Sequence, residues 1–164
     1  MNESSHPPDV WIDGPARLLA GVDRERLRSR LAEAARHLQR PIRRAAIRLV
    51  DDDEMARLHD RHMGVRSPTD VLTFDMAQPG GPIEADLVIC VDEARRIAAE
   101  LGHDVEREVL LYALHGLLHC AGFDDQDEPG AAAMHAEEDR ILRLIGVGPT
   151  YDAGGRPAVR GARA

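Results

Sequence analysis

Two histidines four residues apart are the side chains in this sequence best placed to bind a metal ion. His115 and His119 lie within a strongly apolar stretch, and in a helix residues at this spacing project from the same face, one turn apart. The helix is expected to break at Gly122. If the chain turns back there, it can place a carboxylate just downstream against the same cation. Two histidines and one carboxylate leave a coordination position open, as catalytic zinc sites do. The available carboxylates are Asp124, Asp125 and Asp127, of which we favour Asp125.

Other interpretations of this helix compete with the metal site. The histidines can instead be hydrogen-bonded core residues, although two at this spacing before several carboxylates favour a metal. Cys120 is a rival soft ligand, but it lies about 100° around the helix from His119, and a buried apolar role suits it better. Glu108, seven residues before His115, can support a histidine N–H or, as we favour, form a salt bridge. Gly116 stands where H-E-x-x-H peptidases carry their glutamate base, which excludes that class.

The elements that would position these residues are predicted from hydrophobic periodicity and from turn residues. Asp23 and Asp104 are expected to cap two helices, and the acidic run 51–54 suits the start of another helix better than a metal cluster. The pattern predicts an α+β fold in which a small mixed β-sheet is covered by about five helices. The predicted strands are 10–12, 45–50, 71–74 and 86–90, and the predicted helices are 23–38, 51–63, 91–101, 104–121 and 129–145.

The 164 residues are expected to form one domain at 9–147, with a disordered lead at 1–8 and a flexible tail at 148–164. Aromatic residues are only 3% of the chain, so the core must consist of Leu, Val, Ile and Ala. No apolar run reaches the roughly 18 residues of a membrane span, and the N-terminus does not resemble a signal peptide. The two cysteines make no disulfide framework. These features predict a cytoplasmic protein without a membrane partner; they give no oligomeric state.

Charge is distributed unevenly along the chain. The net charge is −8, which argues at first against nucleic acid as a partner. However, all 21 basic residues are arginines, and residues 24–48 carry nine of them against two glutamates, a local balance of +7. A GC-rich genome is the favoured explanation of the arginine bias, yet the planar guanidinium also suits phosphate. Within this stretch Arg43 and Arg44 are candidates to follow an RNA backbone; a solvated face is the equal alternative.

Three ordered segments resemble the YbeY family of bacterial metal-dependent endoribonucleases, also called rRNA maturation factors. The family signature H-G-x-L-H-x-x-G-Y-D-H is matched by residues 115–125, HGLLHCAGFDD. Residues 67–74, SPTDVLTF, resemble the P-T-D-V-L-S-F block, and residues 85–90, ADLVIC, resemble the G-D-I-V-I-S strand. The order and spacing of these blocks cover roughly residues 10–145. The family's three histidines bind zinc, so the resemblance implies one Zn²⁺ per chain.

The sequence departs from the family at two places. Asp125 replaces the third histidine; zinc accepts carboxylate oxygen, but the added charge makes the metal a weaker Lewis acid and admits Mn²⁺ or another divalent ion. The family usually has a Tyr-Arg pair about five residues before its Pro-Thr block, where this chain has His62 and Met63. Arg61 and Arg66 lie close enough in sequence to substitute, Arg61 as a catalytic candidate and Arg66 as a candidate RNA contact. The loss of that arginine bears on the rate of cleavage.

The resemblance implies a metal-dependent endoribonuclease that cuts single-stranded RNA. It further implies a role in maturing the 3′ end of 16S rRNA and in ribosome quality control, with rRNA and ribosomal subunits as partners. Two alternatives stay open at this point. One is a non-catalytic ribosome-assembly factor whose metal fastens the helix to the following loop, and the other is a small-molecule metallohydrolase.

Overall fold

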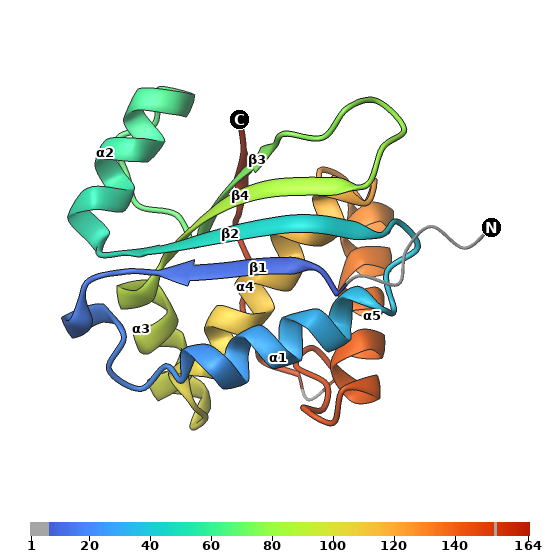
Figure 1. The fold of residues 1–164 in the computed structure, drawn as a ribbon. Coiled ribbons are helices and arrows are strands. Elements are labelled where there is room, and N and C mark those ends of the chain that lie inside the picture. The colour runs from blue at the N-terminus through green and yellow to red at the C-terminus, as the bar shows by residue number, and fades with distance from the viewer. Residues whose placement is uncertain (1–6, 153) are drawn as a thin grey trace.

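The computed structural model describes residues 7–152 and 154–164, and in these residues five α-helices pack on one five-stranded sheet (Figure 1). The strands are β1 (Asp9–Asp13), β2 (Ile42–Val50), β3 (Val71–Asp75), β4 (Ile83–Cys90) and β5 (Ala162–Arg163). The helices are α1 (Arg24–Ala35), α2 (Asp52–Met63), α3 (Val91–Leu101), α4 (Val105–Cys120) and α5 (Glu128–Leu144). A short 3-10 turn lies at Ala16–Leu18.

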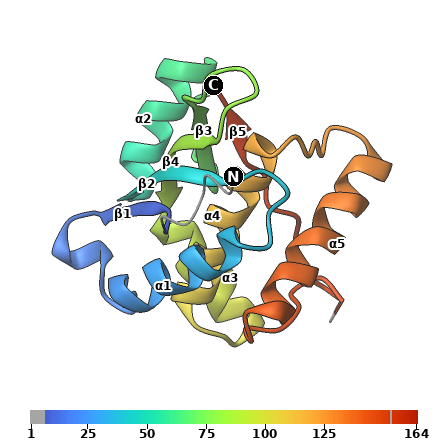
Figure 2. The same cartoon turned by 45° about the vertical axis from the view of Figure 1, so that its right-hand side comes forward.

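The sheet is mixed and has the strand order β1-β2-β4-β3-β5. Strand β2 pairs in parallel with β1 and β4, whereas β3 runs antiparallel to β4 and parallel to β5. Helices α1, α3, α4 and α5 lie on one face of the sheet, and α2 lies on the other (Figures 1 and 2). Helix α4 therefore runs through the middle of the helical layer, directly against the sheet.

Aspartates cap the N-termini of three helices, where the free backbone N–H groups need acceptors. The carboxylates of Asp23, Asp51 and Asp127 each accept a hydrogen bond from a backbone N–H in the first turn of α1, α2 and α5. The acidic run at 51–54 is thus a helix start, as predicted. Asp104 occupies the N-cap position of α4, but its side chain makes no capping hydrogen bond, which corrects our expectation for that residue.

The close approach of α4 to the sheet depends on Gly116. A β-carbon at this position would lie 2.7 Å from Leu87 Cδ2 and 2.7 Å from Thr73 Oγ1, which is closer than carbon atoms pack. Leu87 and Thr73 belong to β4 and β3, so the glycine lets the helix rest on both strands. This close packing sets the distance between the sheet and the part of α4 that carries the neighbouring His115.

The core consists mainly of Leu, Val, Ile and Ala, as the composition predicted. It lies between the sheet and the four-helix layer, and α4 is buried along almost its whole length. A smaller apolar cluster lies under α2 on the opposite face; it contains Val50, Met55, Leu72, Val88 and Cys90. No helix in residues 7–152 and 154–164 has the length and apolar character needed to cross a membrane.

The fold confirms the predicted α+β class, the mixed sheet and the positions of all five helices. The segment 148–164 differs from the expectation of a flexible tail without a core-forming pattern. Val159 is buried, Arg156 forms an ion pair with Glu108, and β5 adds a strand next to β3. These contacts join residues far apart in sequence, so no local pattern predicted them. Of the predicted disordered lead, residues 1–6 lie outside the described residues.

Candidate metal centre

His115 and His119 project from the last two turns of α4, and their reactive nitrogens face each other. The Nε2 atoms lie 3.1 Å apart, and the two rings meet edge to face. Tetrahedral zinc with bonds of about 2.0–2.1 Å holds two ligand atoms about 3.3 Å apart, so the helix alone sets nearly the required separation. Both side chains are buried, which keeps them in one orientation.

Asp125 completes the group from the turn that follows α4. The chain reverses at Gly122, whose φ of 106° is a left-handed value that favours glycine. This reversal brings Asp125 Oδ2 to 3.3 Å from His115 Nε2 and Oδ1 to 3.5 Å from His119 Nε2. The three residues together offer ligand atoms that all lie within 4.8 Å of one another. They could hold one metal ion, and the partly exposed carboxylate leaves one side of it accessible.

The other carboxylates after Gly122 are engaged elsewhere. Asp127 caps α5 by accepting a hydrogen bond of 2.7 Å from the N–H of Gly130. Asp124 pairs with Arg163 at 3.2 Å. The geometry therefore brings Asp125 toward the histidines, in agreement with the order of preference drawn from the sequence.

The outer nitrogen of each histidine is held by a hydrogen bond that fixes its tautomer. His115 Nδ1 donates to Glu138 Oε1 at 2.7 Å, and His119 Nδ1 donates to the carbonyl oxygen of Phe123 at 3.0 Å. With the proton on Nδ1, each Nε2 presents a lone pair toward the other ring. Two facing lone pairs repel each other unless a cation lies between them, so the donor set suits a metal ion.

Burial favours the neutral, ligating form of His119. Burial, reinforced by the neighbouring His115, lowers the pKa of His119 below the ordinary histidine value. The second oxygen of Glu138, Oε2, is buried and finds no hydrogen-bond partner among the described residues. A buried carboxylate oxygen without a partner is costly, and a divalent ion on the far side of the His115 ring would compensate the charge of this carboxylate.

Sequence reasoning missed Glu138 as the partner of His115. A signal was present, because Glu138 stands in the apolar stripe of α5 with Met134, Ile141 and Leu142, all of which are buried. Glu108, the residue considered for this role, instead forms a fully buried ion pair with Arg156 and contacts His103. The favoured salt-bridge interpretation of Glu108 is thus correct, and the supporting role belongs to Glu138.

Cys120 does not join the ligand group, although it lies beside it. Burial raises the pKa of its thiol to about 12, and its sulfur is not among the ligand atoms that converge at the site. A cavity of about 260 Å³ opens next to the histidines. It is lined by Thr73, Asp75, His119, Cys120, Arg163 and Ala164.

The arginines singled out in the sequence lie outside this cavity. Arg43 pairs with Glu84 and Arg44 with Asp86, each at 2.8 Å, across strands β2 and β4. Arg66 is exposed and lies 3.6 Å from Asp60. Arg61 is exposed near the end of α2. The structure thus brings the predicted ligands together but leaves the predicted RNA-contacting and catalytic arginines apart from them.

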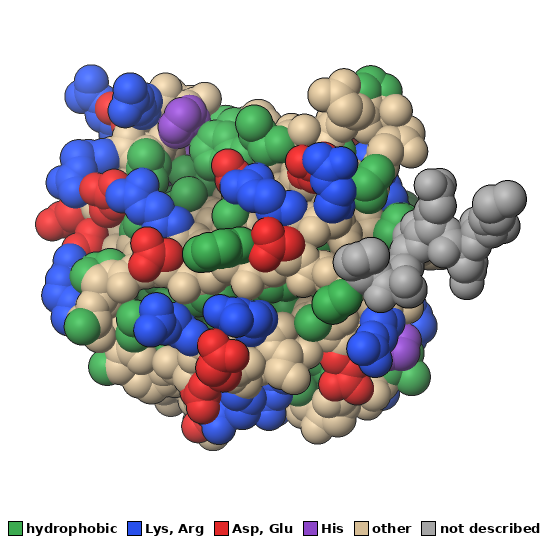
Figure 3. Space-filling model, viewed as in Figure 1, with side chains coloured by type: hydrophobic (Ala, Val, Ile, Leu, Met, Phe, Trp, Pro, Cys, Tyr) green, Lys and Arg blue, Asp and Glu red, His purple; other side chains and the backbone are tan. Residues whose placement is uncertain are grey.

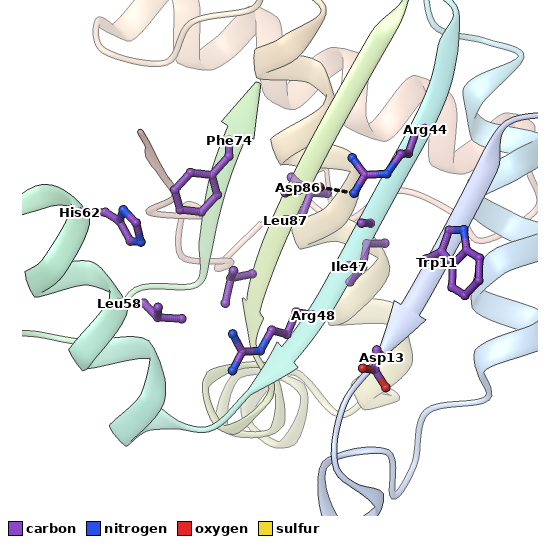
Figure 4. A pocket seen from close by; sticks show the side chains of 12 residues that line it. Trp11, Asp13, Arg44, Ile47, Arg48, Leu58, His62, Phe74, Asp86 and Leu87 are labelled. Carbon is purple, nitrogen blue, oxygen red and sulfur yellow. Dashed lines mark ion pairs between the residues drawn. The ribbon is translucent and has the colours of Figure 1, made fainter. Parts of the chain in front are cut away.

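Arg44 lines a separate groove of about 430 Å³ on the sheet face that also carries α2 (Figure 4). Trp11, with 63% of its surface exposed, forms one wall, and the edge-to-face pair of His62 and Phe74 forms the other. Arginine and acidic side chains intermingle on this side of the molecule and do not form one positive patch (Figure 3). The groove combines paired charges with exposed rings.

The fold and the cluster define a small α+β protein that could hold one divalent ion at the end of its central helix. The family model described as Endoribonuclease YbeY matches residues 22–146. The Endoribonuclease YbeY of Methylococcus capsulatus is 39% identical over 123 residues, which cover 73% of this chain and 81% of the relative. That of a Synechococcus strain is 38% identical over 148 residues, covering 82% and 91%. The chain belongs to the YbeY family.

A solved structure agrees with this assignment. The solution structure of TM1509 from Thermotoga maritima superimposes with a TM-score of 0.60 at 25% sequence identity. The match covers 83% of this chain and 88% of that protein. The mixed sheet and its helical layer are therefore shared with that protein.

Proposed function

We propose that this protein is a metal-dependent endoribonuclease that cuts single-stranded RNA. Its relatives are named endoribonucleases, and family membership extends that activity to this chain. The observation that carries the metal dependence is the convergence of His115 Nε2, His119 Nε2 and the Asp125 carboxylate at the end of α4. The role we infer is in rRNA processing, at the 3′ end of 16S rRNA, with ribosomal subunits as partners.

Zinc is the ion we infer for this site. Two imidazole nitrogens and one carboxylate oxygen suit tetrahedral zinc and leave the fourth position to water or substrate. When bound, the ion polarises a phosphoryl oxygen and lowers the pKa of bound water. Because Asp125 brings a negative charge where the family carries histidine, Mn²⁺ is the ion we expect to compete best with zinc.

The surrounding residues orient the ligands. Glu138 and the Phe123 carbonyl hold the two rings so that both Nε2 atoms point toward Asp125. Asp125 lies at the accessible side of the group, beside the cavity that His119 lines. A phosphodiester can therefore approach from the cavity without displacing a buried side chain. We further propose Arg43, Arg44 and Arg66 as backbone contacts for RNA outside the site.

The support that Glu138 gives to His115 leads to a measurable prediction. Glu138→Gln keeps a side chain of the same shape but removes the charge behind the imidazole. We expect metal affinity to fall about ten- to hundredfold, as for other residues that hold a metal-binding histidine. Competition with a chromophoric chelator measures this loss. Glu137→Gln, which removes the neighbouring carboxylate that pairs with Arg140 instead of a histidine, serves as the control. Equal affinities in the two variants would mean that Glu138 does not act on the metal.

The proposed activity is tested by cleavage of labelled single-stranded and double-stranded RNA. The parent should cut the single strand, lose the activity with a chelator and regain it with zinc or Mn²⁺. His119→Ala should cut no faster than the chelated parent, whereas His37→Ala, outside the site, should cut normally. A folded parent that binds RNA or ribosomal subunits but cuts neither RNA under any of these conditions would favour the non-catalytic assembly factor.

A further inference from the structure

The C-terminal segment is held against the domain at several separate points. The carboxylate of Asp139 accepts hydrogen bonds from the backbone N–H groups of Thr150, Tyr151 and Asp152. Further on, Arg156 pairs with the buried Glu108. These residues lie beyond the family match, which ends at residue 146. The segment therefore lies outside the residues that the family model matches, and this chain fastens it to its own core.

The same segment ends beside the metal ligands. The backbone N–H of Arg160 donates to Asp70 at 2.6 Å, immediately before β5 pairs with β3. Gly161 passes so close to His115 that a β-carbon would lie 3.1 Å from its Nε2 atom. Two residues further on, Arg163 of β5 pairs with Thr73 of β3, and both residues line the cavity. Residues distant in sequence thus place a guanidinium in the cavity that His119 lines.

Negative charge gathers around this cavity. Asp75 lines the cavity, Asp124 contacts Arg163, Asp125 is the proposed ligand and Glu138 supports His115, so four carboxylates lie at or near the site. Carboxylates alone would repel an anionic phosphate. Arg163 brings a positive charge to the lining of the cavity, where a phosphate must enter.

We propose that Arg163 binds a phosphate group of the RNA next to the metal ion, an inference that rests on the proposed function. One of its nitrogens, Nη2, donates to Asp124 at 3.2 Å, which anchors the side chain. A guanidinium has five N–H donors in a planar fork, so donors remain for the oxygens of a phosphate. About 40% of the side chain is exposed, which leaves it accessible from the cavity.

This assignment also offers a substitute for a residue that the family pattern leads one to expect. Met63 occupies the position of the family's usual arginine, and Arg61 and Arg66 lie outside the cavity beside His119. Arg163, in the C-terminal strand β5, lines that cavity. The cationic group near the metal is therefore supplied by β5 in this protein.

The test measures RNA binding in the presence of a chelator, so that neither the metal nor cleavage contributes. The probe is a fluorescein-labelled single-stranded oligouridylate, and its anisotropy is followed at several salt concentrations. Arg163→Ala is compared with Arg28→Ala, which removes the same charge from a side chain of similar exposure, 47%. Arg28 lies in α1, far from the candidate metal site. Its neighbour Arg26 contacts Glu106 in the first turn of α4, and Glu106 is about 20 Å along that helix from His119. Arg163→Lys keeps the charge without the planar fork.

Arg163→Ala should weaken binding by about tenfold, the effect of one charge-assisted contact, and reduce the salt slope by about 0.7. Arg28→Ala should change both much less, and Arg163→Lys should restore the slope but only part of the affinity. Metal content and thermal unfolding of each variant verify that the site and fold persist. Equal effects of Arg163→Ala and Arg28→Ala, or tighter binding by Arg163→Ala, would overturn the inference. If the parent neither binds nor cuts RNA, the proposed function itself fails.

Discussion

Replacing Asp125 by alanine is expected to reduce metal affinity by more than a hundredfold. The loss of a residue that only supports a ligand costs about ten- to hundredfold, and Asp125 is the proposed ligand itself. It approaches both Nε2 atoms to 3.3 and 3.5 Å, whereas Asp124 and Asp127 bind Arg163 and the α5 N-terminus. Competition titration with a chromophoric chelator, for zinc and for Mn²⁺, measures the change.

Matched variants separate the three carboxylates. Asp124→Ala should retain metal affinity close to that of the parent. Asp125→His restores the ligand set of the family and should keep zinc bound while weakening Mn²⁺, because imidazole suits the softer ion. Near-normal affinity in Asp125→Ala would move the third ligand to Asp124 or Asp127. A fall in zinc affinity in Asp125→His would mean that the backbone after Gly122 is not placed as in the family.

Glu108→Ala is expected to lower the free energy of unfolding by about 3–5 kcal/mol, because it leaves a buried guanidinium without its partner. The side chains of Glu108 and Arg156 are 0% and 2% exposed, and two nitrogens of Arg156 bind the carboxylate at 2.5 and 2.8 Å. Urea denaturation followed by far-UV circular dichroism measures the loss.

Two comparisons show whether burial causes this loss. Glu137→Ala breaks the partly exposed pair with Arg140 and should cost at most about 1 kcal/mol. Replacing both buried partners, with Glu108→Leu and Arg156→Met together, should recover much of the stability, because no charge is then left unpaired. A cost for Glu108→Ala no greater than that for Glu137→Ala would contradict the packing of the C-terminal segment.

Most of the fold was predictable because its elements carry local signals. The helices show apolar residues at helical spacing, and their starts carry carboxylates such as Asp23 and Asp51 that cap the first turn. The convergence of the three candidate ligands was predictable for the same reason. His115 and His119 are fixed on one face by helix geometry, and Asp125 follows a glycine that reverses the chain.

The rest depends on contacts between distant residues. Glu138 meets His115 across 23 positions, and Arg160 meets Asp70 across 90. Strand β5 has two residues, too few for an alternating pattern, and it forms because β3 offers an open edge. Charge counting assigned the RNA-contacting role to Arg43 and Arg44, but it could not show that each pairs with a carboxylate across the sheet.

We propose that His115, His119 and Asp125 hold one divalent ion on which RNA cleavage depends. Elemental analysis of the purified protein tests this directly, with metal counted per chain and His119→Ala measured beside the parent. We expect about one zinc or manganese ion per parent chain and none in the variant. A parent that contains no metal and takes up neither ion on addition would contradict it, as would a His119→Ala variant that keeps the full metal content.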